Sequence, residues 1–536
     1  MRLYNTASGQ KEELKTLKPH EVSMYVCGPT TYNLIHLGNA RPLVVFDTVR
    51  RYLEYRGYKV NYVQNFTDVD DKIIKRAQEE GEDPLKLAQR YIDEYFVDAE
   101  ALGIRPAQEH PRVSQHIPEI IDAIAKLIDK GYAYESQGDV FFRVRAFSGY
   151  GKLSGRSLDE MQAGARIDIN ELKEDPMDFA LWKAAKPGEP AWDSPWGPGR
   201  PGWHIECSVM STNCLGETID IHGGGSDLIF PHHENEIAQA EALTGKPFVR
   251  YWMHNGFITV NKEKMSKSLG NFFLLREILD KYPADVVRYY LIATHYRSPL
   301  DFDDGKLEEA RRALMRLKNT RTLLGEFLDD SSGADQDLHE KGTQFWAKLC
   351  QIRDSFIEAM DDDFNTARAI GHLFEMSHEI NAYLAQADPE DPADQAALGR
   401  ARDLYLELGN LLGIFRDKTP HDKEEMIDKV LGVVVSLRQA ARQAKNYAMA
   451  DSLRDYLRDL GVAVEDRGEE SRFRYDSPPQ LSSLVDYLLS IRKSLKAERN
   501  YEWADQIRDQ LSEAGIIVED TREGVRWRIA ESRTLG

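Results

Sequence analysis

Cysteine is scarce in this chain, and the few that occur lie far apart. The 536 residues include four cysteines, at positions 27, 207, 214 and 350. A disulfide framework is typical of short chains with closely spaced cysteines, so this pattern excludes one. Unpaired thiols are usual in reducing compartments. We therefore expect a cytoplasmic protein whose cysteines serve packing or metal binding.

Long apolar stretches and a positive overall charge are missing as well. No segment approaches the roughly 18 apolar residues of a membrane-spanning helix, and residues 1–10 contain no apolar signal core, so we expect no membrane contact. The formal net charge is −20. An acidic chain that binds nucleic acid must gather Lys and Arg on one face, because attraction by the whole protein is unavailable to it.

The first clear pattern is a pair of short apolar strands near the N-terminus. Alternating apolar residues at 22–26 predict a buried strand that Gly28 and Pro29 end, and residues 60–63 predict the next one after an intervening helix. This order is typical of a doubly wound parallel sheet. Cys27 would then lie at a carboxyl strand end, where open α/β sheets bind their ligands.

The turn after this strand has polar residues suited to an anion. Asn33 is predicted to cap a helix whose first turns contain His36, Gly38 and Asn39. Backbone N–H groups at a helix start favour phosphate, and an imidazole adds a further donor. The alternative is an ordinary βα turn with a surface histidine, and the turn by itself leaves both open.

A second segment makes the pattern specific. Residues 264–268 have the sequence Lys-Met-Ser-Lys-Ser. They match the KMSKS signature of class I aminoacyl-tRNA synthetases, and residues 36–39 resemble the HIGH signature of the same class. With Cys27 ahead of the first signature, the chain resembles the cysteinyl-tRNA synthetase family in particular. Asn39 stands where the signature has a second His, and its amide can still donate to a phosphate or ribose oxygen.

The resemblance implies ATP-dependent activation of L-cysteine to cysteinyl-adenylate, then transfer to the 3′-terminal adenosine of tRNA(Cys), with Mg²⁺ accompanying ATP. The ATP-binding residues that it implies are His36, Gly38, Asn39, Lys264 and Lys267. His36 and Lys267 would act in catalysis, because the departing pyrophosphate gains negative charge that cationic donors stabilise. Thr67 and Trp203 would line the amino-acid pocket.

Four potential metal ligands are spread along the chain: Cys27, Cys207, His232 and Glu236. Two thiolates, an imidazole and a carboxylate suit Zn²⁺. His232 and Glu236 are four residues apart on a predicted helix and so share one face. Each cysteine is placed on a predicted strand and could equally be a core thiol. The resemblance implies that the four residues bind one Zn²⁺, which selects cysteine through its thiol.

The chain divides into several predicted domains. Residues 1–130 and 201–258 form two halves of a Rossmann-like catalytic domain, and short strands and turns at 131–200 indicate a connective insertion. Residues 259–304 resemble the KMSKS and stem-contact region of the family. Helical spacing predicts a bundle at 305–418, and a polar break at 417–425 predicts a linker.

The C-terminal part repeats itself. Asn446-Tyr447 matches Asn500-Tyr501, 54 positions later, and the match continues without a gap to Arg474 and Arg528. This indicates a duplicated small α+β module, at 426–478 and 480–536, in which each copy has a helix, a glycine stop and a β-hairpin. The resembling family carries this anticodon-facing module once.

Arginines recur at equivalent positions of the two copies: Arg438, Arg454, Arg472, Arg492, Arg508 and Arg526. They are candidates for contacts with tRNA phosphates or bases, while the many acidic neighbours make a solvated helical face the alternative. We expect residues 430–475 to recognise the anticodon and residues 480–536 to add backbone affinity, because an anticodon-binding module must keep a fixed offset from the active site.

Two rival functions remain open at this point. A ligase of the same fold that joins cysteine to a small amine acceptor would keep the metal and nucleotide residues but would not need residues 305–536. A non-catalytic tRNA-binding protein would explain the C-terminal half but not the conjunction of nucleotide and metal residues. For the enzyme we expect a monomer that uses ATP, L-cysteine and tRNA(Cys).

Overall fold

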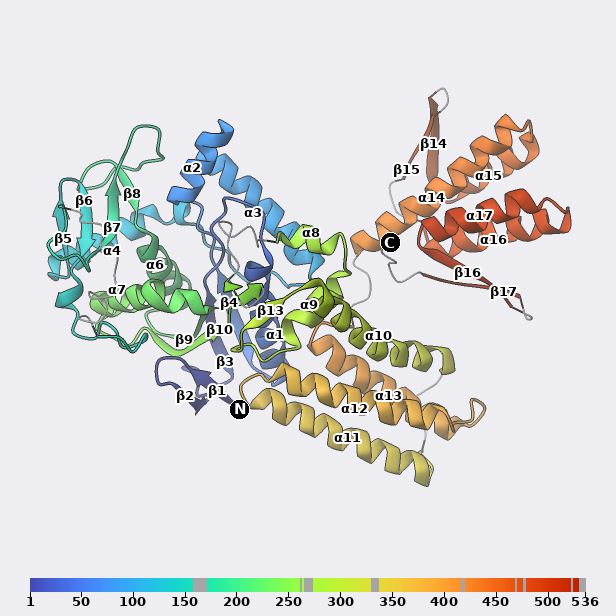
Figure 1. The fold of residues 1–536 in the computed structure, drawn as a ribbon, viewed down its shortest axis with the longest axis horizontal. Helices are drawn as coiled ribbons and strands as arrows, with labels where there is room; N and C mark the ends of the chain where they lie inside the picture. Colours follow the sequence, from blue (N-terminus) through green and yellow to red (C-terminus); the bar gives the residue numbers. More distant parts are fainter. Residues whose placement is uncertain are drawn as a thin grey trace. The chain divides into compact units, whose positions relative to one another are not determined.

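The computed structural model describes residues 1–157, 171–260, 263–264, 273–328, 337–415, 420–467, 470–475, 479–521 and 524–529. They belong to two compact units, Met1–Phe415 and Arg416–Gly536 (Figure 1). Among these residues, no helix combines the length and apolar character that a membrane span requires.

Four parallel strands form the centre of the first unit. Their order is β10 (Val249–Asn255), β9 (Ile219–Gly225), β3 (Glu21–Val26) and β4 (Lys59–Gln64). The connection from β3 to β4 is α1 (Leu37–Tyr55), as in a βαβ unit. This confirms the predicted Rossmann-like sheet, and the carboxyl ends of β3, β4 and β9 meet at one edge.

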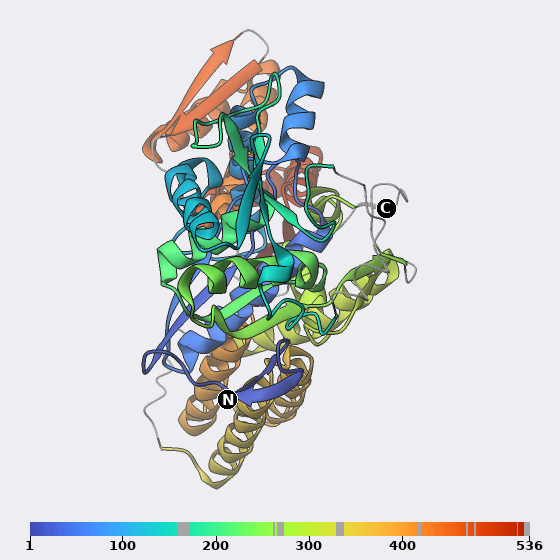
Figure 2. The same ribbon diagram turned by 90° about the vertical axis from the view of Figure 1, so that its left-hand side faces the viewer.

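The insertion folds as a separate antiparallel sheet. Its strands are, in order, β5 (Ala133–Ser136), β6 (Asp139–Phe142), β7 (Phe179–Ala184) and β8 (Gly199–Pro201). One apolar core joins this sheet to α4 (Ile117–Asp129), α6 (Trp203–Leu215) and α7 (Glu234–Thr244). Figure 2 shows the sheet in teal, facing the viewer. The insertion is thus tied to α6 and α7, which supply two of the predicted metal ligands, Cys207 and Glu236.

Smaller elements complete this part of the unit. They are the hairpin β1 (Arg2–Asn5) and β2 (Gln10–Glu13), the helices α2 (Asp71–Glu80), α3 (Pro84–Ala101), α8 (Leu275–Leu279) and α9 (Ala284–Ile292), and a small sheet in the order β12 (Glu263–Lys264), β11 (Ile258–Val260) and β13 (Leu300–Phe302). Strand β11 follows closely on β10, so the small sheet continues from the central one.

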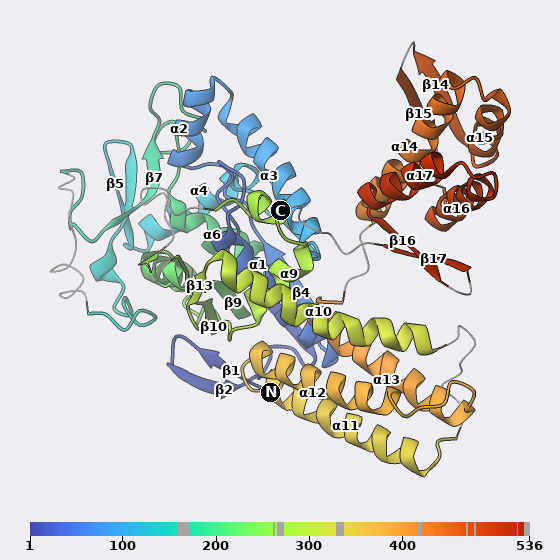
Figure 3. The same ribbon diagram turned by 45° about the vertical axis from the view of Figure 1, so that its right-hand side comes forward.

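A helical bundle ends the first unit, as predicted. It comprises α10 (Asp304–Phe327), α11 (Glu340–Asp361), α12 (Thr366–Leu384) and α13 (Pro392–Leu411), which Figure 3 shows from yellow-green to orange. The fully buried Arg288 of α9 joins the bundle to the sheet domain. Its guanidinium donates to Asp47 Oδ2 at 2.6 Å and to the Leu412 carbonyl at 2.9 Å.

Each copy of the C-terminal module has two helices before its hairpin. The first copy has α14 (Pro420–Gln443), α15 (Tyr447–Asp459), β14 (Val462–Arg467) and β15 (Glu470–Tyr475), and the second has α16 (Leu481–Ala497), α17 (Tyr501–Glu513), β16 (Ile516–Thr521) and β17 (Gly524–Ile529). The predicted linker at 417–425 is therefore wrong from Pro420 onward, where α14 begins. Gly461 and Gly515 end their helices with φ of +76° and +85°, as a left-handed stop requires.

The two copies share one hydrophobic core. Leu453 and Leu457 of the first copy and Leu488 and Leu511 of the second are fully buried in the same cluster. A sequence repeat predicts similar folds but not a joint core. Because neither copy encloses its own apolar face, the second unit behaves as one body.

Contacts across the two copies are reciprocal. The Tyr456 hydroxyl of α15 donates to the Ser483 carbonyl of α16 at 2.6 Å, and the Tyr456 and Tyr487 rings stack with centroids 3.6 Å apart. Gln510 occupies the position of Tyr456 in the second copy and accepts from Ser436 Oγ of α14 at 3.2 Å. The second helix of each copy thus contacts the first helix of the other.

Candidate metal centre and nucleotide site

Four side chains from three places in the sequence meet at the edge of the central sheet. Cys27 follows β3, Cys207 lies on α6, His232 lies in the π-helical segment η4 (Ile229–His233), and Glu236 lies in the first turn of α7. The prediction of a strand around Cys207 is wrong. Residues 205–211 are buried on every side, and a helix without an exposed face lacks the apolar period that would reveal it in the sequence.

Their donor atoms have the spacing of a metal site. Cys27 Sγ lies 3.7 Å from Cys207 Sγ, 3.6 Å from His232 Nε2 and 3.6 Å from Glu236 Oε1, and His232 Nε2 lies 3.0 Å from Glu236 Oε1. Ligands of one tetrahedral Zn²⁺, with metal bonds of about 2.0–2.3 Å, are themselves about 3.3–3.8 Å apart. The three distances from Cys27 Sγ fall in this range, whereas His232 Nε2 and Glu236 Oε1 are closer together and would separate slightly to share one ion.

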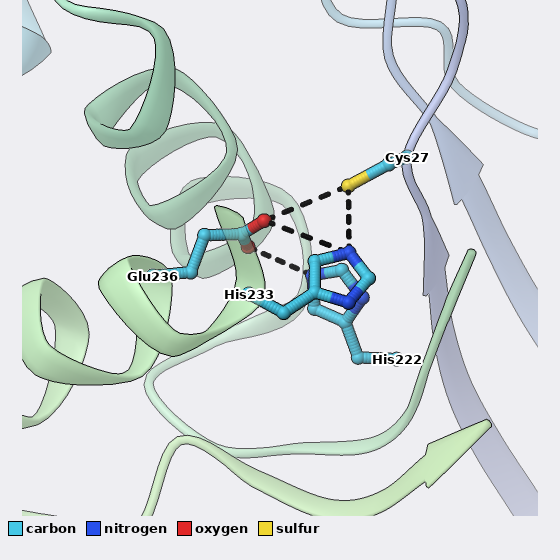
Figure 4. Close-up of side chains that lie close together, drawn as sticks. All are labelled: Cys27, His222, His233 and Glu236. Atoms are coloured by element: carbon cyan, nitrogen blue, oxygen red, sulfur yellow. Dashed lines mark hydrogen bonds and ion pairs between the residues drawn. The ribbon is translucent and has the colours of Figure 1, made fainter. Parts of the chain in front are cut away.

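Further histidines form a layer behind these donors. His222 Nε2 lies 2.8 Å from Glu236 Oε2, the oxygen not directed at Cys27, and His233 Nε2 lies 3.4 Å from Cys27 Sγ (Figure 4). These two histidines with Cys27 and Glu236 make a second possible ligand group. Because His222 bonds the outward oxygen, we interpret it as a residue that orients a ligand.

The ring of His233 is fixed in turn. Its Nδ1 lies 2.8 Å from His254 Nε2, and His254 Nδ1 lies 2.8 Å from Thr6 Oγ1. Burial first, and then the neighbouring His222, lowers the pKa of His254 to about 3. A chain of neutral imidazoles thus leads from the centre to the N-terminal hairpin.

The electrostatics of the cluster favour a cation. Against the effect of burial, His222 and His232 lower the pKa of Glu236 to about 2. The hydrogen bond from Cys27 lowers the pKa of the Cys207 thiol to about 6, although burial opposes this. Burial raises the pKa of Cys27. A carboxylate and one thiolate are therefore formed at neutral pH, while Glu236, against the effect of burial, raises the pKa of His232 to about 10. A metal ion would displace the protons of Cys27 and His232.

The predicted pocket residues contact these same elements. Trp203, with 39% of its surface exposed, stacks on His232 with ring centroids 4.4 Å apart. Thr67 is buried in the segment that follows β4, and its hydroxyl donates to Glu206 Oε2 at 3.1 Å. Glu206 precedes Cys207 on α6. Trp203 therefore contacts one predicted metal ligand, His232, and Thr67 contacts the neighbour of another, Cys207.

The predicted nucleotide residues lie at the start of α1. His36, rather than the predicted Asn33, is the N-cap: its Nδ1 accepts from the Asn39 N–H at 3.3 Å, and Asn39 Oδ1 accepts from the His36 N–H at 3.3 Å. With Nδ1 as acceptor, His36 Nε2 carries the ring proton. Gly38 lies in the same half-buried turn, so its backbone and these side chains form one group of donors.

The segment that follows the KMSKS residues runs beside this turn. The Leu37 N–H donates to the Phe273 carbonyl at 3.2 Å, and the Leu275 N–H donates to the Ile35 carbonyl at 3.0 Å. Lys264 belongs to β12, although its side chain is not among those described. Lys267 lies outside the described residues.

A third cluster of possible metal ligands, His339, Asp391 and Asp394, lies in the helical bundle. His339 Nδ1 accepts from the Gly342 N–H at 2.8 Å, so its Nε2 carries the proton and donates to Asp394 at 3.0 Å. Neither ring nitrogen has a free lone pair for a metal. The cluster therefore caps α11 and links it to α13.

The repeated arginines separate into two classes. Arg438 and Arg492 have exposed fractions of 6% and 2%, so the prediction that they contact tRNA is wrong for this structure: a buried guanidinium does not reach a phosphate. Arg454 and Arg508 are exposed, and each lies beside acidic residues of its own helix. Arg526 is also exposed, whereas the side chain of Arg472 is not among those described.

Family models cover most of the chain. Residues 13–312 match the catalytic domain of tRNA synthetases class I (C), and residues 355–416 match the DALR domain. Residues 432–474 and 478–528 each match the cysteinyl-tRNA ligase anticodon binding domain. The two separate matches agree with the duplication.

Several curated relatives carry the same name. The chain is 56% identical to a cysteine–tRNA ligase of Pelotomaculum thermopropionicum over 491 residues, 88% of this chain and 99% of the relative. A cysteine–tRNA ligase of Carboxydothermus hydrogenoformans is 52% identical over 528 residues, 98% of this chain and all of the relative. The share of this chain left unmatched by the first relative is close to the length of one C-terminal module.

A solved structure agrees on the fold. Methionyl-tRNA synthetase of Mycobacterium tuberculosis, in complex with methionyl-adenylate, superposes with a TM-score of 0.55 at 16% identity, over 73% of this chain and 90% of that one. From the family models and the identity with curated relatives, we conclude that this chain belongs to the cysteinyl-tRNA synthetase family of class I aminoacyl-tRNA synthetases.

Proposed function

We propose that the protein activates L-cysteine with ATP and transfers it to the 3′-terminal adenosine of tRNA(Cys). The observation that carries this proposal is the position of the four-donor cluster, which lies at the same sheet edge as the α1 turn. A thiol substrate bound at one and a nucleotide at the other would meet across the crevice of a doubly wound sheet. Membership of the ligase family supports the same reaction.

Cys27, Cys207, His232 and Glu236 would hold one Zn²⁺. The ion would supply a soft Lewis acid for the substrate sulfur, which the hydroxyl of serine does not match. Trp203 covers His232 from the accessible side, so its indole can exclude water and close over the amino acid. Thr67, whose hydroxyl is held by Glu206, would line the same pocket.

The chain's part in adenylate formation is positioning and electrostatic stabilisation. The α1 turn would bind ATP phosphates through the His36 and Asn39 side chains and the Gly38 backbone, aided by the helix dipole. Lys264 and Lys267 would stabilise the charge that builds on pyrophosphate, together with the Mg²⁺ that accompanies ATP. No protein nucleophile is needed, because the substrate carboxylate attacks the α-phosphate.

The second unit would bind tRNA. The exposed arginines at 454, 508 and 526 are its candidate contacts, with residues 430–475 recognising the anticodon and residues 480–536 adding affinity. Both copies have the helix–hairpin form, which supports a shared kind of partner. The joint core means that deleting 480–536 would expose apolar surface of the first copy, so point variants are the sharper test.

A monomer in a reducing, cytoplasmic environment fits this chemistry. All four cysteines are unpaired, and the two in the metal cluster must stay reduced in order to bind an ion.

Pyrophosphate exchange tests the function directly. Cysteine-dependent exchange of radiolabelled pyrophosphate into ATP, without exchange on serine, is expected of the full chain. Adding tRNA(Cys) should yield acid-precipitable cysteinyl-tRNA. Exchange with transfer to a small amine instead of tRNA would favour the ligase of the same fold, and absence of cysteine-dependent exchange would refute the enzyme proposal.

A further inference from the structure

A buried cation next to the nucleotide turn has no part in the function described so far. Arg41 lies on α1 one turn after Gly38 and is fully buried. Among the described residues, no carboxylate forms an ion pair with it. Burial lowers its pKa to about 10, so the guanidinium still carries its charge at neutral pH. An uncompensated buried charge is costly and requires an explanation.

Its partners are four backbone carbonyls from two segments. Nη1 donates to the Gly256 carbonyl at 2.8 Å and the Phe257 carbonyl at 3.0 Å. Nη2 donates to the Ser298 carbonyl at 2.6 Å and the His295 carbonyl at 3.5 Å. Nε has no partner. The planar fork of arginine therefore joins α1 to both segments at once, which an ammonium cannot do.

The two segments are closely packed where Arg41 holds them. The Gly256 N–H donates to the Tyr296 carbonyl at 2.9 Å. A Cβ on Gly256 would lie 2.6 Å from the Ser298 carbonyl oxygen and 2.7 Å from that of Arg297. Only glycine fits this approach, so the junction is built to bring carbonyl oxygens together around the guanidinium.

The first segment leads directly to the KMSKS residues. Phe257 precedes β11, and β11 pairs with β12 in the register Thr259 to Lys264. On the far side of these residues, Phe273 and Leu275 are bonded to the start of α1. Both ends of the KMSKS segment are thus fastened to the first turns of α1, one through backbone hydrogen bonds and the other through Arg41.

We propose that Arg41 is a positioning residue for cysteine activation, which sets the distance between the nucleotide turn of α1 and the strand pair that carries Lys264. It acts through backbone carbonyls and touches no substrate. The proposal rests on the proposed function only in taking the α1 turn and Lys264 as the ATP-binding groups. A misplacement of about 1 Å between such groups is enough to cost about a hundredfold in rate.

Stability offers a weaker explanation for this residue. The carbonyls of Gly256, Phe257 and His295 each accept another hydrogen bond, from Asn255 Nδ2 and from the Leu300 and Ser298 N–H groups. Replacing Arg41 by methionine would therefore leave few carbonyls without a hydrogen bond and would remove a buried charge. Such an exchange often leaves the free energy of unfolding nearly unchanged. We accordingly expect Arg41→Met to fold.

Steady-state pyrophosphate exchange by the full-length protein tests the proposal. Arg41→Met is expected to lower kcat about a hundredfold, with zinc content and the KM for cysteine unchanged, because Arg41 contacts none of the metal-ligand segments. Arg41→Lys keeps the charge without the fork and should lose at least about tenfold. A wild-type kcat in either variant would overturn the proposal.

Arg288→Met is the matched control, since Arg288 is equally buried but is paired with Asp47. It should lower the thermal midpoint and leave the kcat of the folded protein unchanged. Wild-type exchange is measured first and tests the enzyme function by itself, so a failure of the Arg41 proposal is distinguishable from a failure of that function.

A double-mutant cycle with Lys264→Ala tests whether Arg41 acts by positioning Lys264. If Arg41 acts by placing β12, Arg41→Met should cost much less in the Lys264→Ala background than in the wild type. Losses that multiply in the double variant would show that Arg41 acts independently of Lys264 and would overturn the proposal.

Discussion

The metal centre and the C-terminal repeats hold their charged side chains in different ways. At the metal centre, donors from α6, η4 and α7 converge until their atoms lie within 4 Å of Cys27 Sγ. In the repeats, equivalent arginines diverge, with Arg438 and Arg492 buried and Arg454 and Arg508 exposed. The first arrangement is directed at a single point, and the second is not.

The difference shows what each pattern is evidence for. Donors that converge from distant positions are expensive to bury unless something occupies their centre. Repetition by duplication keeps every residue that the module needs, whether for packing or for a ligand. A repeated arginine is therefore evidence of function only when it is also exposed, and burial decides between the two.

The largest effect on function is expected from a substitution at the metal centre. Cys207→Ser removes one of the two soft ligands, so zinc affinity should fall by more than about a hundredfold and the KM for cysteine should rise with it. The zinc content after dialysis against a chelator reports the zinc affinity, and the kinetics of pyrophosphate exchange give the KM for cysteine.

Cys214→Ser is the control for this substitution, because Cys214 lies on the same helix, half-buried and outside both groups of donors that include Cys27. It should keep its zinc and its KM. Stoichiometric zinc in Cys207→Ser, with an ordinary KM for cysteine, would remove Cys207 from the site.

A smaller effect on metal affinity is expected at His222, which contacts the proposed ligand Glu236. His222→Leu removes the donor to Glu236 Oε2, and loss of such an outer contact costs about 10–100-fold in metal affinity. His222→Gln can place an amide N–H near the position of Nε2 and should recover most of that loss. Chelator competition measures the affinities. Equal losses in the two variants would mean that His222 matters for its packing against Trp252 and not for its hydrogen bond.

Two strands of the central sheet could be predicted from the sequence pattern, whereas the set of four proposed ligands came from the family resemblance. The strand alternation before Cys27 has a period of two, and the spacing of His232 and Glu236 is helical. The helix around Cys207 could not be predicted, because it is buried on all sides and has no period. The cap at His36 competed with Asn33, a residue type more usual in that position.

Residues that act through the backbone leave no signal in the sequence. The partners of Arg41 are carbonyls of residues more than two hundred positions away, and every residue has a carbonyl. His222 lies on β9 and Glu236 lies on α7, and the sequence does not reveal that their side chains meet. The shared core of the two C-terminal copies likewise depends on tertiary packing, which the sequence repeat does not reveal.

The smallest expected effect is at the exposed arginines, and it decides between the two copies. Arg454→Ala and Arg508→Ala should leave pyrophosphate exchange unchanged and weaken tRNA charging several-fold. If the side chain contacts a phosphate, each variant should reduce the slope of log K for tRNA binding against log salt concentration by about one. Arg492→Met, a buried counterpart, should alter the thermal unfolding of the C-terminal unit and leave that slope intact. If the first copy recognises the anticodon, Arg454→Ala should also reduce discrimination between tRNA(Cys) and anticodon variants, while Arg508→Ala should not. The opposite result would assign recognition to the second copy, and unchanged slopes in both variants would leave these arginines as solvated partners of their acidic neighbours.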